Sequence, residues 1–130
     1  MKKIVLSIFA LAVGVTSFAQ WDETHKITSS DGAWGDEFGT VVDISGTRKI
    51  VGAPEHDAAG SGSGTAYIYE LVEGEWIETK LMPSVHSNND RFGAAVAIDG
   101  DIAVVVATGE DFPLSNQGAV YVFEYTEESG

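Results

Sequence analysis

The chain has 130 residues, of which 44% are hydrophobic and 21% are charged, with 15 glycines and no cysteine. This is the composition of a folded globular domain and is neither collagen-like nor low-complexity. Seven Lys and Arg stand against 20 Asp and Glu, and the resulting net charge of -13 has the wrong sign for neutralising phosphates, so we expect no nucleic-acid partner.

Residues 1–20 have the pattern of a helical secretory signal peptide. Lys2 and Lys3 precede an apolar run over residues 4–15, and Ser17-Phe18-Ala19 fits an A-x-A-like cleavage pattern. The run is shorter than the roughly 20 residues that cross a bilayer, which disfavours the alternative of a retained membrane helix. We therefore expect a Gram-negative-type bacterial export signal and a secreted or cell-surface product with no membrane insertion after cleavage.

Cleavage would leave a strongly acidic chain that cannot form disulfides. Because Lys2 and Lys3 leave with the signal peptide, the net charge falls from -13 to -15. Without cysteine, the mature chain must hold together by packing or by a bound partner. The acidity favours solubility, with calcium binding as the alternative.

The rest of the chain repeats itself at a shift of 54 residues. Asp36-Glu37-Phe38-Gly39 recurs as Asp90-Arg91-Phe92-Gly93, and the same shift pairs Val51 with Val105 and Tyr67 with Tyr121 without a gap. Residues 76–81 echo residues 21–27 once a single-residue length difference is allowed. The pattern predicts a signal peptide at 1–20 and repeat units over about 21–81 and 90–130.

Each unit is predicted to be an antiparallel meander of four short strands. Short alternating runs of β-branched and aromatic residues, separated by turns at Ser45-Gly46, Glu73-Gly74 and Asp99-Gly100, favour strands joined by hairpins. The expected strands are Phe38–Ile44, Lys49–Ala53, Gly64–Glu70 and Trp76–Leu81, then Phe92–Ile98, Ile102–Ala107 and Gly118–Glu124. The fold class is all-β, with units the size of a propeller blade and no helix after residue 20.

The ordered elements Phe38-Gly39, Val51-Gly52-Ala53-Pro54 and Gly64 to Tyr69 resemble the FG-GAP repeat of integrin-alpha-type β-propellers. The Trp76–Leu81 extension resembles the bacterial variety of that repeat. The resemblance covers residues 21–130 and implies antiparallel four-stranded propeller blades, about two of them, forming an incomplete ring. The second copy departs from the pattern, with Val106-Ala107-Thr108 where Gly-Ala-Pro is expected.

The resemblance directs attention to calcium, which integrin-type repeats hold in an aspartate-rich loop between the FG and GAP strands. Residues 45–49 offer no carboxylate at that place, and Asp99 and Asp101 stand in a turn too short for a six-oxygen cage. Asp57 and Asp111 occupy one repeat position in longer loops, which favours loop capping over metal binding. We expect no cofactor and retain weak calcium candidates, which are Asp57, Asp99, Asp101 and Asp111.

No catalytic pattern is present, and the chain is not expected to be an enzyme. His25, His56 and His86 have no partner at ligand spacing, and neither a G-x-S-x-G nor an H-E-x-x-H motif occurs. Residues 60–64 are glycine-rich but precede a strand and lack a following helix and lysine, which predicts a flexible loop and not a phosphate cradle.

Trp34 is the leading candidate for ligand binding because a large residue present in one unit only is not explained by the repeat. Its loop, residues 30–35, is matched in the second unit by residues 84–89, which contain no tryptophan. An exposed indole suits a sugar ring or a protein partner, whereas packing between blades is the structural alternative. Phe112 in the second long loop is a similar candidate.

Two units cannot close a propeller ring, so we expect either a fragment of a longer protein or a ring of several copies. Further blades in cis or by self-association are therefore expected partners. The leading function is a non-enzymatic secreted or cell-surface module that binds an extracellular protein or glycan, as in adhesion. The alternatives are a scaffold attached to an exported enzyme whose catalytic domain lies outside the chain, and a calcium-stabilised extracellular repeat.

Overall fold

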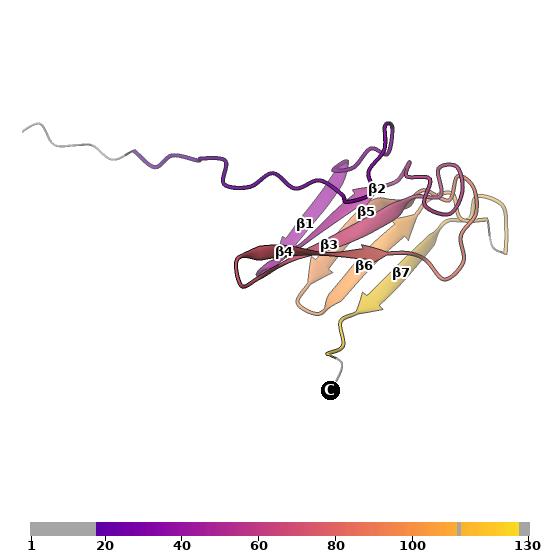
Figure 1. Cartoon of the computed structure of the whole chain (residues 1–130). Helices are drawn as coiled ribbons and strands as arrows, with labels where there is room; N and C mark the ends of the chain where they lie inside the picture. The colour runs from indigo at the N-terminus through magenta and orange to yellow at the C-terminus, as the bar shows by residue number, and fades with distance from the viewer. Residues whose placement is uncertain (1–17, 112, 128–130) are drawn as a thin grey trace, which may run out of the picture.

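The computed structural model describes residues 18–111 and 113–127 and shows an all-β chain (Figure 1). The signal-peptide prediction therefore falls largely outside the described residues, and so does the candidate Phe112. No helix occurs in the described part of the chain, and hence none there is long and apolar enough to cross a membrane. The strands form two antiparallel sheets that do not close on each other.

The first sheet is a four-stranded meander in the order β1-β2-β3-β4. Its strands are β1 (Val41–Ser45), β2 (Arg48–Ala53), β3 (Thr65–Val72) and β4 (Glu75–Leu81). The second sheet has the order β5-β6-β7, with β5 (Phe92–Asp99), β6 (Ile102–Ala107) and β7 (Ala119–Glu124). The prediction of antiparallel strands in this order is confirmed, and each strand of the second sheet repeats its counterpart in the first.

The hairpin turns lie one residue further along than the sequence pattern predicts. Ser45 pairs with Arg48 and Asp99 pairs with Ile102, so the two-residue turns are Gly46-Thr47 and Gly100-Asp101. In both, the glycine has a φ of 56°, as a two-residue hairpin with glycine first requires. The prediction that Ser45 and Asp99 are turn residues is therefore wrong, because the backbone twist needs the positive φ at the first central position.

The start of each first strand is also irregular. Thr40 N–H donates to the Glu37 carbonyl at 3.1 Å, and Ala94 N–H donates to the Arg91 carbonyl at the same distance. These turns delay β1 to Val41, three residues later than predicted, and shift the register between Phe92 and Ala95. The repeat therefore encodes a bulge at the Phe-Gly pair.

The two sheets pack face to face, with β5 lying against β1 and β2 (Figure 1). Buried Phe92 contacts the rings of Tyr121 and Phe123 edge-on, at centroid distances of 5.4 and 6.1 Å. It lies in a cluster that joins Ile50 and Ala66 of the first sheet to Val105 of the second. This cluster is the core that holds the two units together.

A second cluster covers the opposite face of the first sheet. Tyr67 and Tyr69 stack there, with Phe38 edge-on to both rings. Half-buried Ile27 packs against them from the N-terminal segment. Ile27 matches Leu81 in the repeat, and because Leu81 packs in the first cluster, the two residues occupy corresponding places in the two clusters.

An aspartate and a serine of β1 tie the first strands of the two sheets together. Ile98 N–H donates to Asp43 Oδ2 at 2.8 Å, and Gly100 N–H donates to Ser45 Oγ at 2.9 Å. The hydrogen bonds from Ile98 and Ile44 hold the pKa of Asp43 below its usual value. Side chains of β1 thus accept hydrogen bonds from the backbone of β5 and of the turn that follows it.

Candidate functional site

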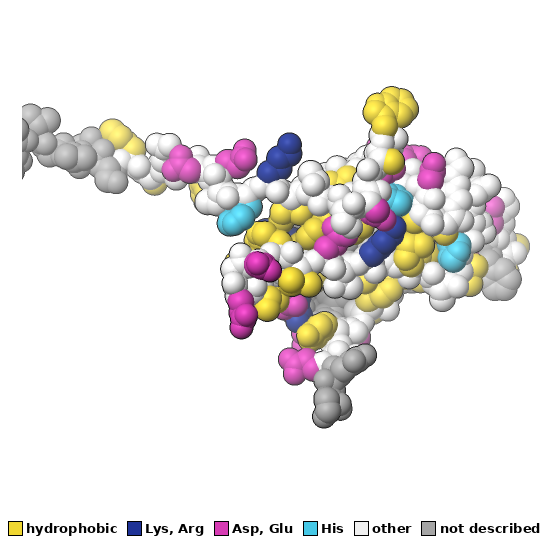
Figure 2. Space-filling model, viewed as in Figure 1, with side chains coloured by type: hydrophobic (Ala, Val, Ile, Leu, Met, Phe, Trp, Pro, Cys, Tyr) yellow, Lys and Arg dark blue, Asp and Glu magenta, His cyan; other side chains and the backbone are white. Residues whose placement is uncertain are grey.

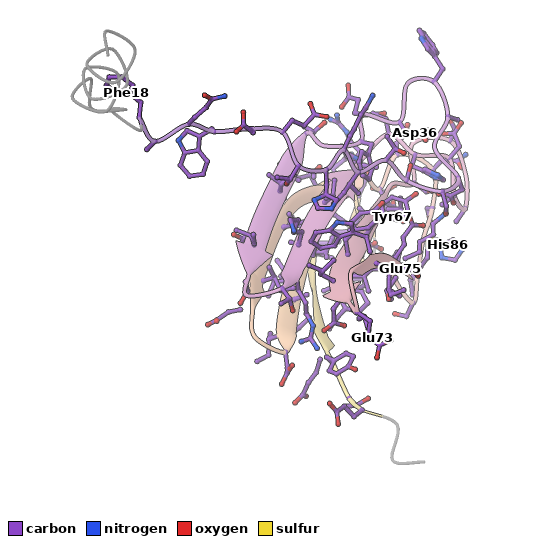
Figure 3. All side chains as sticks on the ribbon, turned by 60° about the vertical axis from the view of Figure 1, so that its left-hand side comes forward. Phe18, Asp36, Tyr67, Glu73, Glu75 and His86 are labelled. Atoms are coloured by element: carbon purple, nitrogen blue, oxygen red, sulfur yellow. The ribbon has the colours of Figure 1, made fainter. Side chains whose placement is uncertain are left out.

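The loops cluster at one end of the sheets, where Asp36 lies, and the β3–β4 hairpin with Glu73 marks the other end (Figure 3). Trp34 stands at the loop end and its side chain is fully exposed. Buried Asp36 fixes this loop, because its Oδ2 accepts the Ala33 N–H at 2.6 Å. Asp90 accepts the Ser87 N–H in the same way. Among the described residues, the Trp34 side chain packs against neither unit.

Trp34 lies at the rim of a polar pocket of about 430 Å³ between its own loop and residues 55–62. Asn89 of the second unit completes the lining. Acidic side chains dominate the pocket, and on the visible face of the molecule Asp and Glu also outnumber Lys and Arg (Figure 2). The carboxylates that line it are Asp31, Asp36, Glu37, Glu55 and Asp57.

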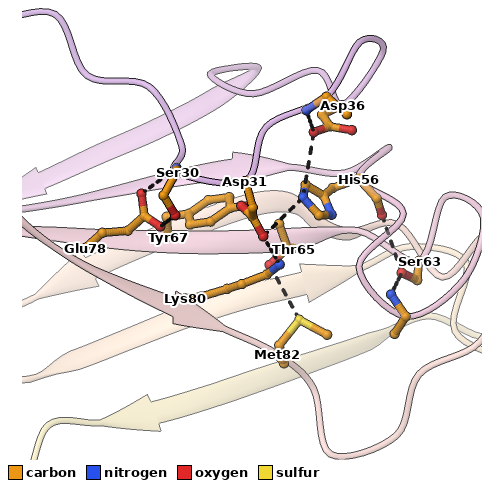
Figure 4. Close-up of polar contacts among 12 residues, drawn as sticks. Ser30, Asp31, Asp36, His56, Ser63, Thr65, Tyr67, Glu78, Lys80 and Met82 are labelled. Atoms are coloured by element: carbon orange, nitrogen blue, oxygen red, sulfur yellow. Dashed lines mark hydrogen bonds and ion pairs between the residues drawn. The ribbon is translucent and has the colours of Figure 1, made fainter.

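Asp31 anchors the inner side of the pocket through two charge-assisted contacts (Figure 4). Lys80 Nζ donates to Asp31 Oδ2 at 2.6 Å, and Tyr67 Oη donates to Asp31 Oδ1 at 2.7 Å. These hydrogen bonds, the one from Lys80 first, lower the pKa of Asp31 to about 2. Burial, followed by the contact with Asp31, raises the pKa of Tyr67. Asp31 is therefore an ionised, positioned acceptor at neutral pH.

His56 lies buried behind this wall, with 7% of its surface exposed. Its Nε2 lies 3.6 Å from Asp31 Oδ2 and 3.7 Å from Asp36 Oδ2, and neither ring nitrogen makes a hydrogen bond to the described residues. The second unit has Glu110 at this repeat position, and Tyr121 Oη donates to Glu110 Oε2 at 2.9 Å. Burial and then Glu110 raise the pKa of Tyr121 to about 12. The matching tyrosines therefore have different carboxylate partners in the two units, Asp31 for Tyr67 and Glu110 for Tyr121.

Asp57 and Asp111 act as loop caps. Asp57 Oδ1 accepts the Gly62 N–H at 2.8 Å, and Asp111 Oδ1 accepts the Asn116 N–H at 2.6 Å. Each aspartate thus reaches five residues along its own loop, which is the capping role that their shared repeat position predicts. The carboxylates are turned toward backbone amides rather than toward each other.

Asp99 and Asp101 lie at the far end of the sheets from the pocket. Asp101 Oδ1 accepts from Arg48 Nη1 at 2.6 Å, and the same guanidinium reaches Glu70 through Nε at 3.1 Å. Asp99 is exposed at the end of β5. Among residues 18–111 and 113–127, no three His, Asp or Glu side chains are arranged to hold a metal ion.

The glycine-rich segment 60–64 is held in place by the second unit. Asn89, Arg91 and Phe92 donate backbone N–H groups to the carbonyls of Ser61, Gly62 and Ser63 at 2.8, 3.1 and 3.0 Å. Arg91 Nη2 also pairs with Glu55 Oε1 at 2.5 Å. The segment is a loop of bends and turns, as the sequence predicts, and it is hydrogen-bonded to the second unit and ends in a single bridge between Gly64 and Phe92. Nothing in its spacing indicates this contact between units.

Two tandem antiparallel sheets with matched Phe-Gly bulges and matched caps define the chain as a β-repeat protein. The family model of the FG-GAP repeat matches residues 21–69 and 76–123, so the chain belongs to the FG-GAP repeat family. Each matched unit starts at a tryptophan, Trp21 or Trp76, which places residues 21–27 in the repeat position of β4. No curated protein and no solved structure matches the chain significantly.

Proposed function

We propose that this protein is a non-enzymatic, secreted or cell-surface β-propeller module that binds an extracellular protein or glycan through its loop end. The observation that carries the proposal is Trp34, a fully exposed indole on a loop fixed by Asp36. A rigid exposed tryptophan supplies a large contact area at a small cost in conformational entropy. The family supports a repeat module of the β-propeller type, with the two sheets as blades.

The pocket beside Trp34 supports recognition of polar groups. The ionised Asp31 and the loop-capping Asp57 present carboxylate oxygens there, which accept hydrogen bonds from sugar hydroxyls or from backbone and side-chain donors of a protein. Trp34 supplies the apolar surface on which a ring or an aliphatic side chain packs. The second unit does not repeat the indole, so the site is specific to the first unit.

Binding can be tested by screening the purified chain on arrays of glycans and of extracellular proteins, followed by titration calorimetry of each hit. Trp34→Ala should weaken binding of the true ligand at least about tenfold, since central tryptophans contribute on the order of 2 kcal/mol or more. Trp21→Ala is the matched control, because Trp21 is equally exposed but lies away from the pocket. Equal binding by wild type and Trp34→Ala would refute the proposal.

Export is the second part of the proposal and rests on residues 1–20. Cleavage at the end of this segment, next to the Ser17-Phe18-Ala19 pattern, would leave a mature chain that begins at about Trp21. Mass spectrometry of protein recovered from the producing cells and from their medium tests this directly. An intact Met1 in all fractions would contradict export by a cleaved signal.

A further inference from the structure

The contact that joins the two units is a plug in a socket. The plug is the Phe92-Gly93 pair, both residues of which are buried. The socket is formed by β2, by β3 and by the residue that precedes β3, and it includes Gly52, Gly64 and Ala66. A Cβ atom on Gly52 would overlap the Gly93 carbonyl oxygen, and one on Gly64 would overlap the Phe92 backbone. The socket therefore admits the backbone of Phe92 and Gly93 because the residues that form its floor have almost no side chains.

The floor of the socket is a cross-strand pair of small residues. Gly52 of β2 is directly opposite Ala66 of β3, and Ala66 lies in the same buried cluster as Phe92. Gly93 has a φ of 94° and presses against the Thr65 carbonyl, so neither partner has room to move away. Small residues at both positions are what allow two backbones to approach this closely.

The second unit has a groove at the same place, but its floor is filled. A cavity of about 400 Å³ is lined by residues 106–108 and 117–120, the repeat positions of 52–54 and 63–66. Gly118 keeps the glycine of the first unit, whereas the cross-strand pair is now Val106 and Val120. Two branched side chains stand where the first unit has Gly52 and Ala66.

The plug of the first unit is free. Phe38 is half-buried and Gly39 is exposed, whereas their counterparts Phe92 and Gly93 are buried. A Cβ on Gly39 would meet no atom within 4 Å, so no described segment seats this plug. Its backbone has the plug conformation nevertheless, with a φ of 91° at Gly39 against 94° at Gly93.

We propose that the valine pair Val106 and Val120 determines which repeat unit can pack after the second unit. The two valine side chains would clash with a Phe-Gly plug that docked on the second unit as Phe92-Gly93 docks on the first unit. The free plug Phe38-Gly39 accordingly fits a partner sheet whose corresponding cross-strand pair is small, and a second copy of this chain is not that partner. This selectivity goes beyond the ligand-binding role of the loop end, because it concerns the face of each sheet that points away from the other sheet.

The first experiment recreates the socket. Val106→Gly with Val120→Ala should produce head-to-tail self-association of the chain, raising the association constant at least about tenfold over wild type in sedimentation equilibrium. Adding Gly39→Asn should abolish the gain, because asparagine tolerates a positive φ but puts a side chain on the plug. Val122→Ala, on β7 but outside the groove, is the matched control and should leave association unchanged.

Two results would overturn the proposal. One is a double variant whose association is no stronger than that of wild type, or is insensitive to Gly39→Asn. The other is a wild-type chain that already associates in a manner that Gly39→Asn abolishes. Far-UV circular dichroism verifies that the double variant folds.

A reciprocal experiment keeps the proposal testable if the double variant does not fold. Gly52→Val with Ala66→Val gives the first unit the floor of the second. The Arg91 and Phe92 amides, which donate to Gly62 and Ser63, should then lose their protection in hydrogen exchange at least tenfold relative to amides of the β3–β4 ladder. Unchanged protection would show that a valine floor still accepts the plug and would overturn the proposal.

Discussion

Gly52 of the first unit and Gly93 of the second meet backbone to backbone, so closely that a side chain on Gly52 would occupy the position of the Gly93 carbonyl oxygen. Gly52 is the glycine of the Val-Gly-Ala-Pro run, and Gly93 is the glycine of the Phe-Gly pair. The two motifs that mark the repeat in sequence are therefore two halves of one contact between successive units. The contact explains why the motifs occur together along the chain.

Gly52→Ala should lower the free energy of unfolding by about 1–3 kcal/mol, the usual cost of forcing extra volume into a packed contact. Urea denaturation followed by tryptophan fluorescence measures the change. Gly74→Asn is the control for replacing a glycine that has no close contact, because Gly74 has open space around it, and its loss, which comes from the φ of 86° alone, should be smaller. Equal losses for both substitutions would argue against a close contact at Gly52.

Arg48→Gln should destabilise the chain by about 1 kcal/mol, since the guanidinium connects Glu70 of β3 to Asp101 of the second sheet and lies 4.1 Å from the Tyr125 ring centroid. Asp101→Asn should cost less, because the Asp101 side chain is largely exposed. Thermal melting at low and at 1 M salt separates the charge contribution, which salt should reduce. A loss that is the same at both salt concentrations would assign the effect of Arg48 to packing.

Asp57→Ala and Asp111→Ala should each lower stability by about 1 kcal/mol through loss of a hydrogen bond to a loop amide. If these aspartates serve only as caps, the melting temperature of the wild type should be the same in EDTA and in millimolar calcium chloride. A rise in the melting temperature with calcium that Asp57→Ala or Asp111→Ala removes would instead support the calcium-stabilised alternative.

Acid should remove the stabilisation that Asp31 provides. Its folded pKa of about 2 lies below the ordinary 3.8, so its contribution is fully present above pH 4 and is lost as the pH falls from about 4 through 2. Because the Asp31 side chain is 44% exposed, we discount the shift for solvent screening and expect a contribution of about 1 kcal/mol. Urea denaturation at pH 7 and pH 2.5 should show Asp31→Asn less stable than wild type at pH 7, with a clearly smaller deficit at pH 2.5. An equal deficit at both values would contradict a charge effect.

The residue order along the chain was sufficient to predict the repeat, the seven observed strands, their antiparallel order and the family. The alternation of apolar residues and the glycine-containing turns are local signals of strands and hairpins. Because the repeat recurs at a constant shift, most of these signals occur in both units. The same comparison pointed to Trp34 as a residue that the repeat does not need, and to Asp57 and Asp111 as loop caps. The inferences about the repeat, the strands and the loop caps were confirmed because they depend on spacing and on short-range backbone geometry, whereas the role of Trp34 stays a prediction.

Contacts between residues far apart in the sequence were decided by the tertiary structure alone. Arg48 lies in residues 45–49, which contain no carboxylate, yet it pairs with Glu70 of β3 and with Asp101 of the second unit, 2.6 Å away. Likewise, the pocket that combines Asp31, His56 and Asn89 arises only when the loop, the glycine-rich segment and the second unit are packed together. The departure from Gly-Ala-Pro at Val106 was visible in the sequence, but its consequence depends on Val120 lying opposite on the neighbouring strand. Pairing across strands and between sheets, and not spacing along the chain, determines which side chains share a surface.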